Sequence, residues 1–178
     1  RLLFLDDGSK EIYWAGDFVV LIELGKLKYK NVMEGWLNHL QVCASKNPPI
    51  ATVVLARNSS KTNKNHFQIE IQWGPLPASK AKAELKKLKS IACQGLEHCW
   101  PVPPESGWAF TKASFRGPLQ GEKAFQQKWD GVFSVQGERI HPEMQLCFGM
   151  QYESRDFINN DNFKEAYESL YTTLIENI

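Results

Sequence analysis

The sequence predicts an α/β fold built around a strand–helix–strand unit, with further helices appended at its C-terminal end. An apolar run over residues 18–24 stops at Gly25 and has the continuous hydrophobicity of a central strand. Residues 29–46 carry apolar side chains at helical spacing, and a β-branched apolar run follows over residues 50–57. Because such a crossover joins parallel strands, we expect strands 18–24 and 50–57 to be parallel.

Two further strand signals flank this unit. Residues 2–5 and 11–14 surround Asp6-Asp7-Gly8-Ser9, a strong turn signal, and therefore predict a hairpin. Residues 66–73 alternate apolar and polar side chains, the pattern of a half-exposed strand. We expect one face of that strand to carry Phe67, Ile69, Ile71 and Trp73.

The remaining chain is predicted to be helical. Helical spacing over residues 78–99 places one apolar stripe at positions 81, 85, 88, 92, 96 and 99. Shorter helical patches follow at residues 122–129 and 142–148, and Asn162 with Glu165 predicts a capping box that opens a final helix. Mid-stripe positions on the two long helices predict that Trp36, Leu40 and Leu85 are buried.

The cysteines predict no metal centre. There are four of them, without paired spacing, and we expect buried thiols in a reducing cytoplasm: Cys43, Cys93, Cys99 and Cys147. His39 lies one helical turn from Cys43, and His98 adjoins Cys99, but neither follows the paired spacing that zinc sites use. Phosphate-binding and dinucleotide-binding glycine motifs are also missing, so we expect no metal and no cofactor.

The charge is unevenly distributed along the chain. The net charge is only +1, yet residues 26–89 carry 12 Lys or Arg against 3 Glu. The segments on both sides of this block are acidic. A basic block beside acidic flanks suggests one face for a polyanion and another for protein partners, although lysines on helices also serve simply to solvate a surface.

The predicted order of elements is that of a restriction-endonuclease-like, or PD-(D/E)XK nuclease-like, core, and also of other α/β sandwiches. Such a nuclease needs acids on adjacent strands to hold magnesium, and a lysine two residues after the second acid. The candidate acids are Asp6 or Asp7 and Glu23, but the lysine position holds Gly25. Lys26 lies one residue after the position that the lysine of such a nuclease occupies. On a strand, a shift of one residue points the side chain to the opposite face of the sheet. We therefore expect a degenerate site here, unless a bulge at Gly25 restores an active nuclease.

Two groups of basic residues predict a phosphate-binding rim. If the two central strands are parallel, both groups lie at the same strand ends: Lys26, Lys28, Lys30, Arg57, Lys61 and Lys64. His66 and Trp73 are aromatic residues nearby that would stack on bases. The alternative is that Trp73 packs in the core and His66 caps a strand, and for Trp73 we favour packing in the core.

Several motifs resemble the C-terminal domain of RecC, the gamma subunit of bacterial exodeoxyribonuclease V. The first runs from Gly25-Lys26-Leu27-Lys28 to Trp36-Leu37-Asn38-His39-Leu40 and Cys43-Ala44. The second has Leu96, Pro101 and Pro103 before Ser106-Gly107-Trp108-Ala109-Phe110. The third has Trp129-Asp130-Gly131, Gly137-Glu138 and His141-Pro142-Glu143, and the helix from Phe163 to Leu174 closes the series. The motifs occur in the same order over nearly the whole chain.

This resemblance implies a nuclease-like domain that has lost its catalytic residues. In the helicase–nuclease it would guide or split double-stranded or forked DNA and hold the RecB and RecD subunits during double-strand-break repair. The domain itself would then be no enzyme, although it serves an exonuclease and helicase complex. Since the chain opens on Arg1, we expect one domain from a longer polypeptide, with a core over residues 1–99 and a helical appendage over 100–178. We expect it in the cytoplasm, without membrane contact.

Three alternatives remain open at this point. The chain could be an active magnesium nuclease of the same fold, or a scaffold that binds protein partners without touching DNA. It could also be a nuclease-like domain of an unrelated bacterial protein.

Overall fold

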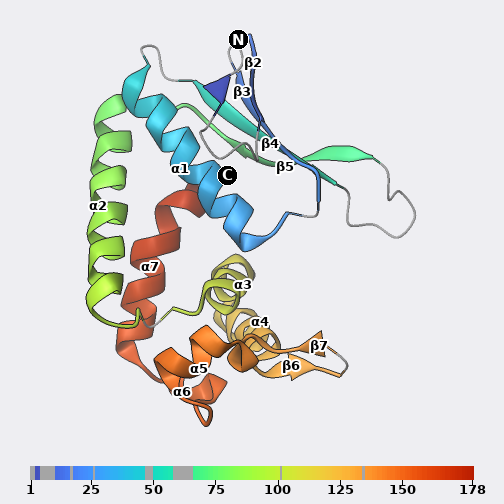
Figure 1. Ribbon diagram of the computed structural model, residues 1–178, viewed down its shortest axis with the longest axis vertical. Coiled ribbons are helices and arrows are strands. Elements are labelled where there is room, and N and C mark those ends of the chain that lie inside the picture. Colours follow the sequence, from blue (N-terminus) through green and yellow to red (C-terminus); the bar gives the residue numbers. More distant parts are fainter. Residues whose placement is uncertain are drawn as a thin grey trace. The chain divides into compact units, whose positions relative to one another are not determined.

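A computed structural model describes most of the chain (Figure 1). The described residues are 3–4, 11–16, 18–25, 27–46, 50–57, 66–100, 102–133 and 135–178. They form two compact units, one comprising Arg1–Leu88 with Asn177–Ile178 and the other Lys89–Glu176. No helix of the described part combines the length and the apolar character that crossing a membrane requires.

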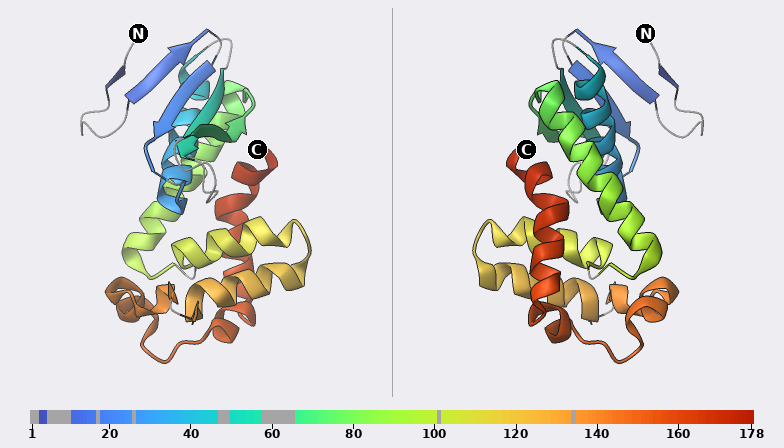
Figure 2. Two further views of the ribbon diagram at one scale, coloured as in Figure 1. Left: turned by 90° about the vertical axis from the view of Figure 1, so that its right-hand side faces the viewer. Right: turned by 90° about the vertical axis from the view of Figure 1, so that its left-hand side faces the viewer.

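The first unit is a five-stranded sheet with helices on one side (Figures 1 and 2). The strands lie in the order β1-β2-β3-β4-β5, with bounds Leu3–Phe4, Glu11–Ala15, Phe18–Glu23, Ala51–Arg57 and Phe67–Trp73. Strands β3 and β4 are parallel and joined by α1 (Tyr29–Ser45), while every other pair is antiparallel. Helix α2 (Ala78–Glu97) begins in this unit. The predicted α/β class, the N-terminal hairpin and the parallel crossover are confirmed.

One face of the sheet packs against α1. Val19 and Leu21 of β3 are buried there, beside Thr52 and Val54 of β4. From the helix, Trp36 and Leu40 are fully buried, as predicted from the stripe, whereas Leu85 of α2 is only half-buried. The prediction for α2 is wrong beyond Leu88, because the stripe continues to Leu96, whose side chain is 89% exposed.

The prediction that one face of β5 carries all four of its apolar residues is wrong, because the strand contains a β-bulge. Ile71 pairs with Val54, but the next residue of β4, Leu55, pairs with Ile69, so that Glu70 is the extra residue. Since successive residues of β4 point to opposite faces, Ile69 lies on the face opposite to Ile71. The four apolar residues of this strand are therefore divided between the two faces. Ile71 and Trp73 are buried towards α1, while Phe67 and Ile69 are 48% and 59% exposed.

The second unit consists mainly of short helices around an aromatic core. Its elements after α2 are α3 (Pro104–Ser114), α4 (Pro118–Asp130), β6 (Gly131–Val132), β7 (Val135–Gln136), η1 (Glu138–Ile140), α5 (Pro142–Phe148), α6 (Ser154–Ile158) and α7 (Asp161–Glu176). Phe125, Phe157 and Phe163 are buried and contact one another with ring centroids 5.0–6.0 Å apart. Such edge and tilted contacts add to the free energy of burial and fix how the helices meet.

A buried carboxylate organises the start of α3, a helix that the sequence did not predict. Glu138 accepts hydrogen bonds from the backbone N–H groups of Glu105 and Ser106, at 2.9 and 2.7 Å, and from the Ser106 hydroxyl. A carboxylate at this end of a helix satisfies its unpaired N–H groups and opposes the positive end of its dipole. The motif that contains Ser106 and the motif that contains Glu138 are far apart in the sequence but are in contact in the structure.

Two local predictions are wrong. The last helix begins at Asp161, and Asn160 rather than Asn162 caps it, since Oδ1 of Asn160 accepts the N–H of Asn162 at 2.9 Å. Asn160 was overlooked because the asparagine two residues later has a glutamate at capping-box spacing. Three of the four cysteines are exposed: Cys93, Cys99 and Cys147. Only Cys43 is buried, and its thiol donates to the carbonyl of Ile50.

His39 is a fully buried residue of the core between α1 and the sheet. Its Nδ1 lies 2.9 Å from the hydroxyl of Thr52, and its ring stacks between Trp36 and Trp73 at centroid distances of 5.3 and 5.8 Å. Burial lowers the pKa of His39 to about 4, although a hydrogen bond to the backbone of Gly74 acts in the opposite direction. The neutral imidazole is therefore a packed and hydrogen-bonded part of the core.

We predict that His39 makes stability depend on pH. Its ordinary pKa of 6.5 falls to about 4 on folding, so the unfolded chain binds the proton more tightly. Stability should be full above pH 6.5 and should fall as the pH drops to about 4, by about 3 kcal/mol from this residue.

Urea unfolding of wild type and His39→Gln between pH 7 and pH 4 measures this contribution. Every other residue is the same in the two proteins, so the difference between the two curves isolates His39. The variant should lose less stability on acidification. Two parallel curves would show that His39 is not buried as a neutral ring.

Candidate functional site

The carboxyl ends of β3 and β4 lie side by side at one edge of the sheet. The parallel register runs from Phe18 opposite Ala51 to Glu23 opposite Ala56. Just beyond it, the backbone N–H of Arg57 donates to the carbonyl of Gly25 at 3.0 Å. The ends of the two strands, which the sequence predicted to be neighbours, are therefore hydrogen-bonded to each other.

The carboxylate of Glu23 lies at this edge and is hydrogen-bonded on both oxygens. Oε2 accepts from Nδ2 of Asn31 at 2.5 Å, and Oε1 accepts from the backbone N–H of Gly25 at 3.3 Å. Glu23 pairs in register with buried Ala56 and thus points to the α1 side of the sheet. An acid that accepts two N–H groups has fewer lone pairs to offer to a cation.

Asn31 uses both ends of its side-chain amide in hydrogen bonds. Its Oδ1 accepts the backbone N–H of Lys28, at 3.1 Å, which ties down the start of α1, while its Nδ2 holds Glu23. The sequence prediction missed this residue. A signal was present, because asparagine is a common partner for free N–H groups at the start of a helix, but nothing in the sequence showed that its other end would reach the strand.

Polar side chains of α1 continue from Glu23 along the helix. Asn31, Glu34 and Asn38 lie on successive turns and line, with Glu23, a cavity of about 20 Å³. That volume holds about one water molecule. Within the described part of the chain, no group of three or more acidic, histidine or cysteine residues is arranged to hold a metal ion. The other candidate acids, Asp6 and Asp7, lie outside the described residues.

Gly25 occupies the position where an active nuclease would have its lysine. A Cβ added to Gly25 would meet only Oε1 of Glu23, at 3.6 Å, an ordinary contact distance. The backbone at this point therefore leaves space for a side chain, and packing does not dictate the glycine. Lys26, the basic residue that follows, lies outside the described residues.

Three members of the predicted basic rim can be placed. Lys28 and Lys30 are exposed at the first turn of α1, and Arg57 is exposed at the end of β4. No acidic side chain lies in the first turn of α1. Cations next to the positive end of a helix dipole repel it, so the binding of an anion here would be favourable. Lys61 and Lys64 lie outside the described residues.

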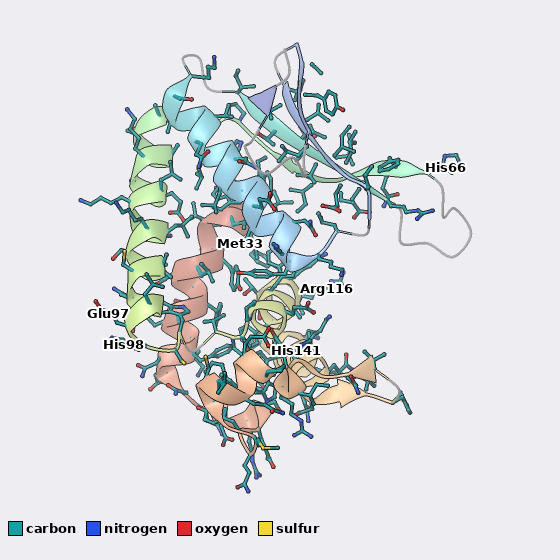
Figure 3. The ribbon with its side chains drawn as sticks, viewed as in Figure 1. Met33, His66, Glu97, His98, Arg116 and His141 are labelled. Atoms are coloured by element: carbon teal, nitrogen blue, oxygen red, sulfur yellow. The ribbon has the colours of Figure 1, made fainter. Side chains whose placement is uncertain are left out.

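The two aromatic candidates have different environments. Trp73 is fully buried and packs against Trp36 at a centroid distance of 5.6 Å. The favoured prediction that it packs in the core is confirmed, and the suggestion that it stacks on bases is wrong. Trp73 follows the bulge and lies in the part of β5 whose apolar side chains face α1, which explains its burial. His66 is exposed just before β5 begins, and Figure 3 shows it projecting beside that strand.

A short hairpin in the second unit carries exposed apolar residues. Strands β6 and β7 pair Gly131 with Gln136 and Val132 with Val135. At the end of β6, Phe133 is fully exposed and has a positive φ of 50°, a conformation that bulky residues rarely adopt. Val135 is 68% exposed. The sequence prediction missed this hairpin because its strands are only two residues long.

The comparisons with known proteins give one family. The family model of the RecC C-terminal domain matches residues 5–115 of the chain. The match includes the strand ends around Glu23 and Arg57, helix α1 and helix α3, whereas the hairpin and Glu138 lie beyond it. A search of curated proteins gave no match.

We predict that the purified chain does not cleave DNA. With magnesium or manganese present, a linear duplex should remain intact, because Glu23 is engaged by Asn31 and Gly25 stands in place of a catalytic lysine. Gel analysis of an end-labelled duplex provides the measurement.

Glu23→Ala is the control for this experiment. Trace cleavage that persists in Glu23→Ala comes from a contaminating enzyme. Metal-dependent cleavage that disappears in this variant would show that the site is active and that the prediction is wrong.

Proposed function

This chain belongs to the RecC C-terminal domain family, and we propose that it is a non-catalytic, nuclease-like domain that guides or splits DNA strands and scaffolds other subunits. Membership gives it a role in the RecBCD complex, exodeoxyribonuclease V, and so in DNA repair. We propose that the domain contacts forked or double-stranded DNA there, that RecB and RecD are its protein partners, and that it works in the cytoplasm.

The state of Glu23 is the observation that carries the non-catalytic part of this proposal. An acid that holds magnesium must present its oxygens to the ion, yet both oxygens of Glu23 accept N–H groups of the protein. The element order supports a nuclease-like core, since three antiparallel strands are followed by a helix and a parallel strand. The competing proposal, an active magnesium nuclease, lacks the lysine at Gly25.

The basic strand ends support DNA contact. Lys28, Lys30 and Arg57 are exposed at one edge of the sheet, and we propose that Lys26, Lys61 and Lys64 extend this rim. Lysines recognise phosphate by charge alone, so the contact would be independent of base sequence. The rim would therefore position a strand along its backbone rather than read its bases.

We also propose that the β6–β7 hairpin is the strand-splitting element. An exposed aromatic ring at the end of a narrow hairpin can stack on a base or wedge between two base pairs. Phe133 meets this requirement, and its positive φ is a strain that packing does not explain, because its side chain is fully exposed.

We predict a specific change in the salt dependence of DNA binding when the rim is neutralised. Non-specific binding by this domain should have a dissociation constant of roughly 10⁻⁴–10⁻⁶ M, and each lysine on a phosphate should contribute about one unit to the slope of log affinity against log salt. The double variant Lys26→Ala with Lys28→Ala should lower that slope by up to about two units. Fluorescence anisotropy at several salt concentrations measures it.

The matched control removes the same charge elsewhere. Lys82 and Lys86 are exposed on α2, and replacing both with alanine should leave the slope nearly unchanged. If the rim instead binds acidic surfaces of partner subunits, the Lys26 and Lys28 variant would keep its DNA affinity and salt slope while co-purifying less with those subunits. That result would favour a pure protein scaffold.

A further inference from the structure

Two thiols of the second unit lie in contact with each other. Cys99 follows the end of α2, and Cys147 is on α5, 48 residues later in the chain. The C-terminal end of α2 lies beside α5 in the views of Figures 1 and 2. The thiol of Cys147 donates a hydrogen bond to the sulfur of Cys99. The fold therefore brings together two cysteines that are far apart in the sequence.

Both side chains are accessible to small reagents. Cys99 and Cys147 are exposed. Cys99 also lines a cavity of about 280 Å³, together with His98, Trp100 and four residues of α7. A water molecule needs only about 10–15 Å³ of such space, so a molecule as small as hydrogen peroxide fits beside the Cys99 sulfur.

The contact gives the two cysteines different roles. The hydrogen bond to Cys99 raises the pKa of Cys147 to about 11, and the burial of Cys147 and the charge of Cys99 act in the same direction. The thiolate is the reactive form of cysteine, whereas Cys147 keeps its proton at neutral pH. The first attack on an oxidant therefore has to come from Cys99, with Cys147 next to it as the second thiol.

We propose that Cys99 and Cys147 form a reversible disulfide when the protein meets hydrogen peroxide, and that this bond is a redox-sensitive clamp within the second unit. The Cys99 thiolate attacks one oxygen of the peroxide, the O–O bond breaks, and Cys99 becomes a sulfenic acid as hydroxide leaves. The Cys147 sulfur then attacks the Cys99 sulfur, the S–O bond breaks, and the hydroxyl leaves with the proton of Cys147 as water. The two thiols are oxidised and the peroxide is reduced. A dithiol reductant reverses the reaction by thiol–disulfide exchange.

An exposed disulfide of this kind suits a reducing compartment. Disulfides of cytosolic proteins are usually transient and redox-sensing, and an exposed one is readily reduced. The bond would close a loop over residues 99–147, which contains α3, α4 and the β6–β7 hairpin. Because closing a loop restricts the opened chain, the elements at its two ends should separate less often in the oxidised protein.

Peptide mapping of the full gamma subunit tests the bond. The protein is treated with hydrogen peroxide, its free thiols are alkylated, and it is digested with trypsin without reduction. Residues 90–112 should then be joined to residues 140–155, and dithiothreitol should separate them. This measurement uses the wild-type protein and does not depend on the folding of a variant. Absence of the joined peptides would overturn the proposal.

Cys93 provides the matched control, because it is exposed on α2 and lies in the same tryptic peptide as Cys99. Cys93→Ser should keep the crosslink, whereas Cys99→Ser should lose it. A crosslink that disappears in Cys93→Ser and persists in Cys99→Ser would overturn the assignment.

Two further measurements test the order of attack and the clamp. In Cys147→Ser the sulfenic acid has no second thiol, so it should accumulate on Cys99, where dimedone traps it. In the oxidised wild type, amide hydrogen exchange of α5 should slow severalfold and should return to its original rate on reduction. Absence of the dimedone adduct from Cys99 would overturn the order of attack. Exchange that oxidation leaves unchanged would overturn the clamp.

Discussion

The hydrogen bonds made by Asn31 connect the central strand to the crossover helix, and the arrangement of the candidate site depends on them. One end of this amide holds Glu23 at the end of β3, and the other holds the backbone of Lys28 at the start of α1. These two bonds direct the acid towards protein donors, and they fix where the first turn of the helix begins. The same residue therefore engages one oxygen of Glu23 and ties down the backbone of Lys28 at the start of the helix.

The second constraint is the apolar character of β3 and β4 on both faces. One face is closed by α1, where Trp36, His39 and Trp73 pack as a stack that leaves the imidazole neutral. The opposite face carries Phe67 and Ile69, which are 48% and 59% exposed. The core of this unit therefore lies on the α1 side of the sheet, and the basic strand ends are the part that we propose meets DNA.

Local patterns were sufficient to predict the first unit, and contacts between distant residues explain what they missed. Continuous apolar runs and the helical stripe of residues 29–46 gave the strands, the crossover and the parallel pairing correctly. The bulge at Glu70 was not visible, because alternation continues unbroken through it in the sequence. Helix α3 was missed because its first turn is held by Glu138, more than 30 residues away. For the site, the sequence alone shows that position 25 holds glycine rather than lysine. The hydrogen bond from Asn31 to Glu23 becomes evident only in the folded structure.

The most direct test of the proposed role is DNA crosslinking in the assembled complex on a forked duplex. A photo-crosslinker at position 28 reports on the basic strand ends, and one at position 82 on α2 is the reference, since both lysines are exposed. We expect position 28 to crosslink to DNA, position 82 not to do so, and the DNA to be cut no differently when Glu23 is replaced by alanine. Crosslinks from position 28 to other subunits alone, without DNA, would contradict a DNA-guiding role and leave this domain a protein scaffold.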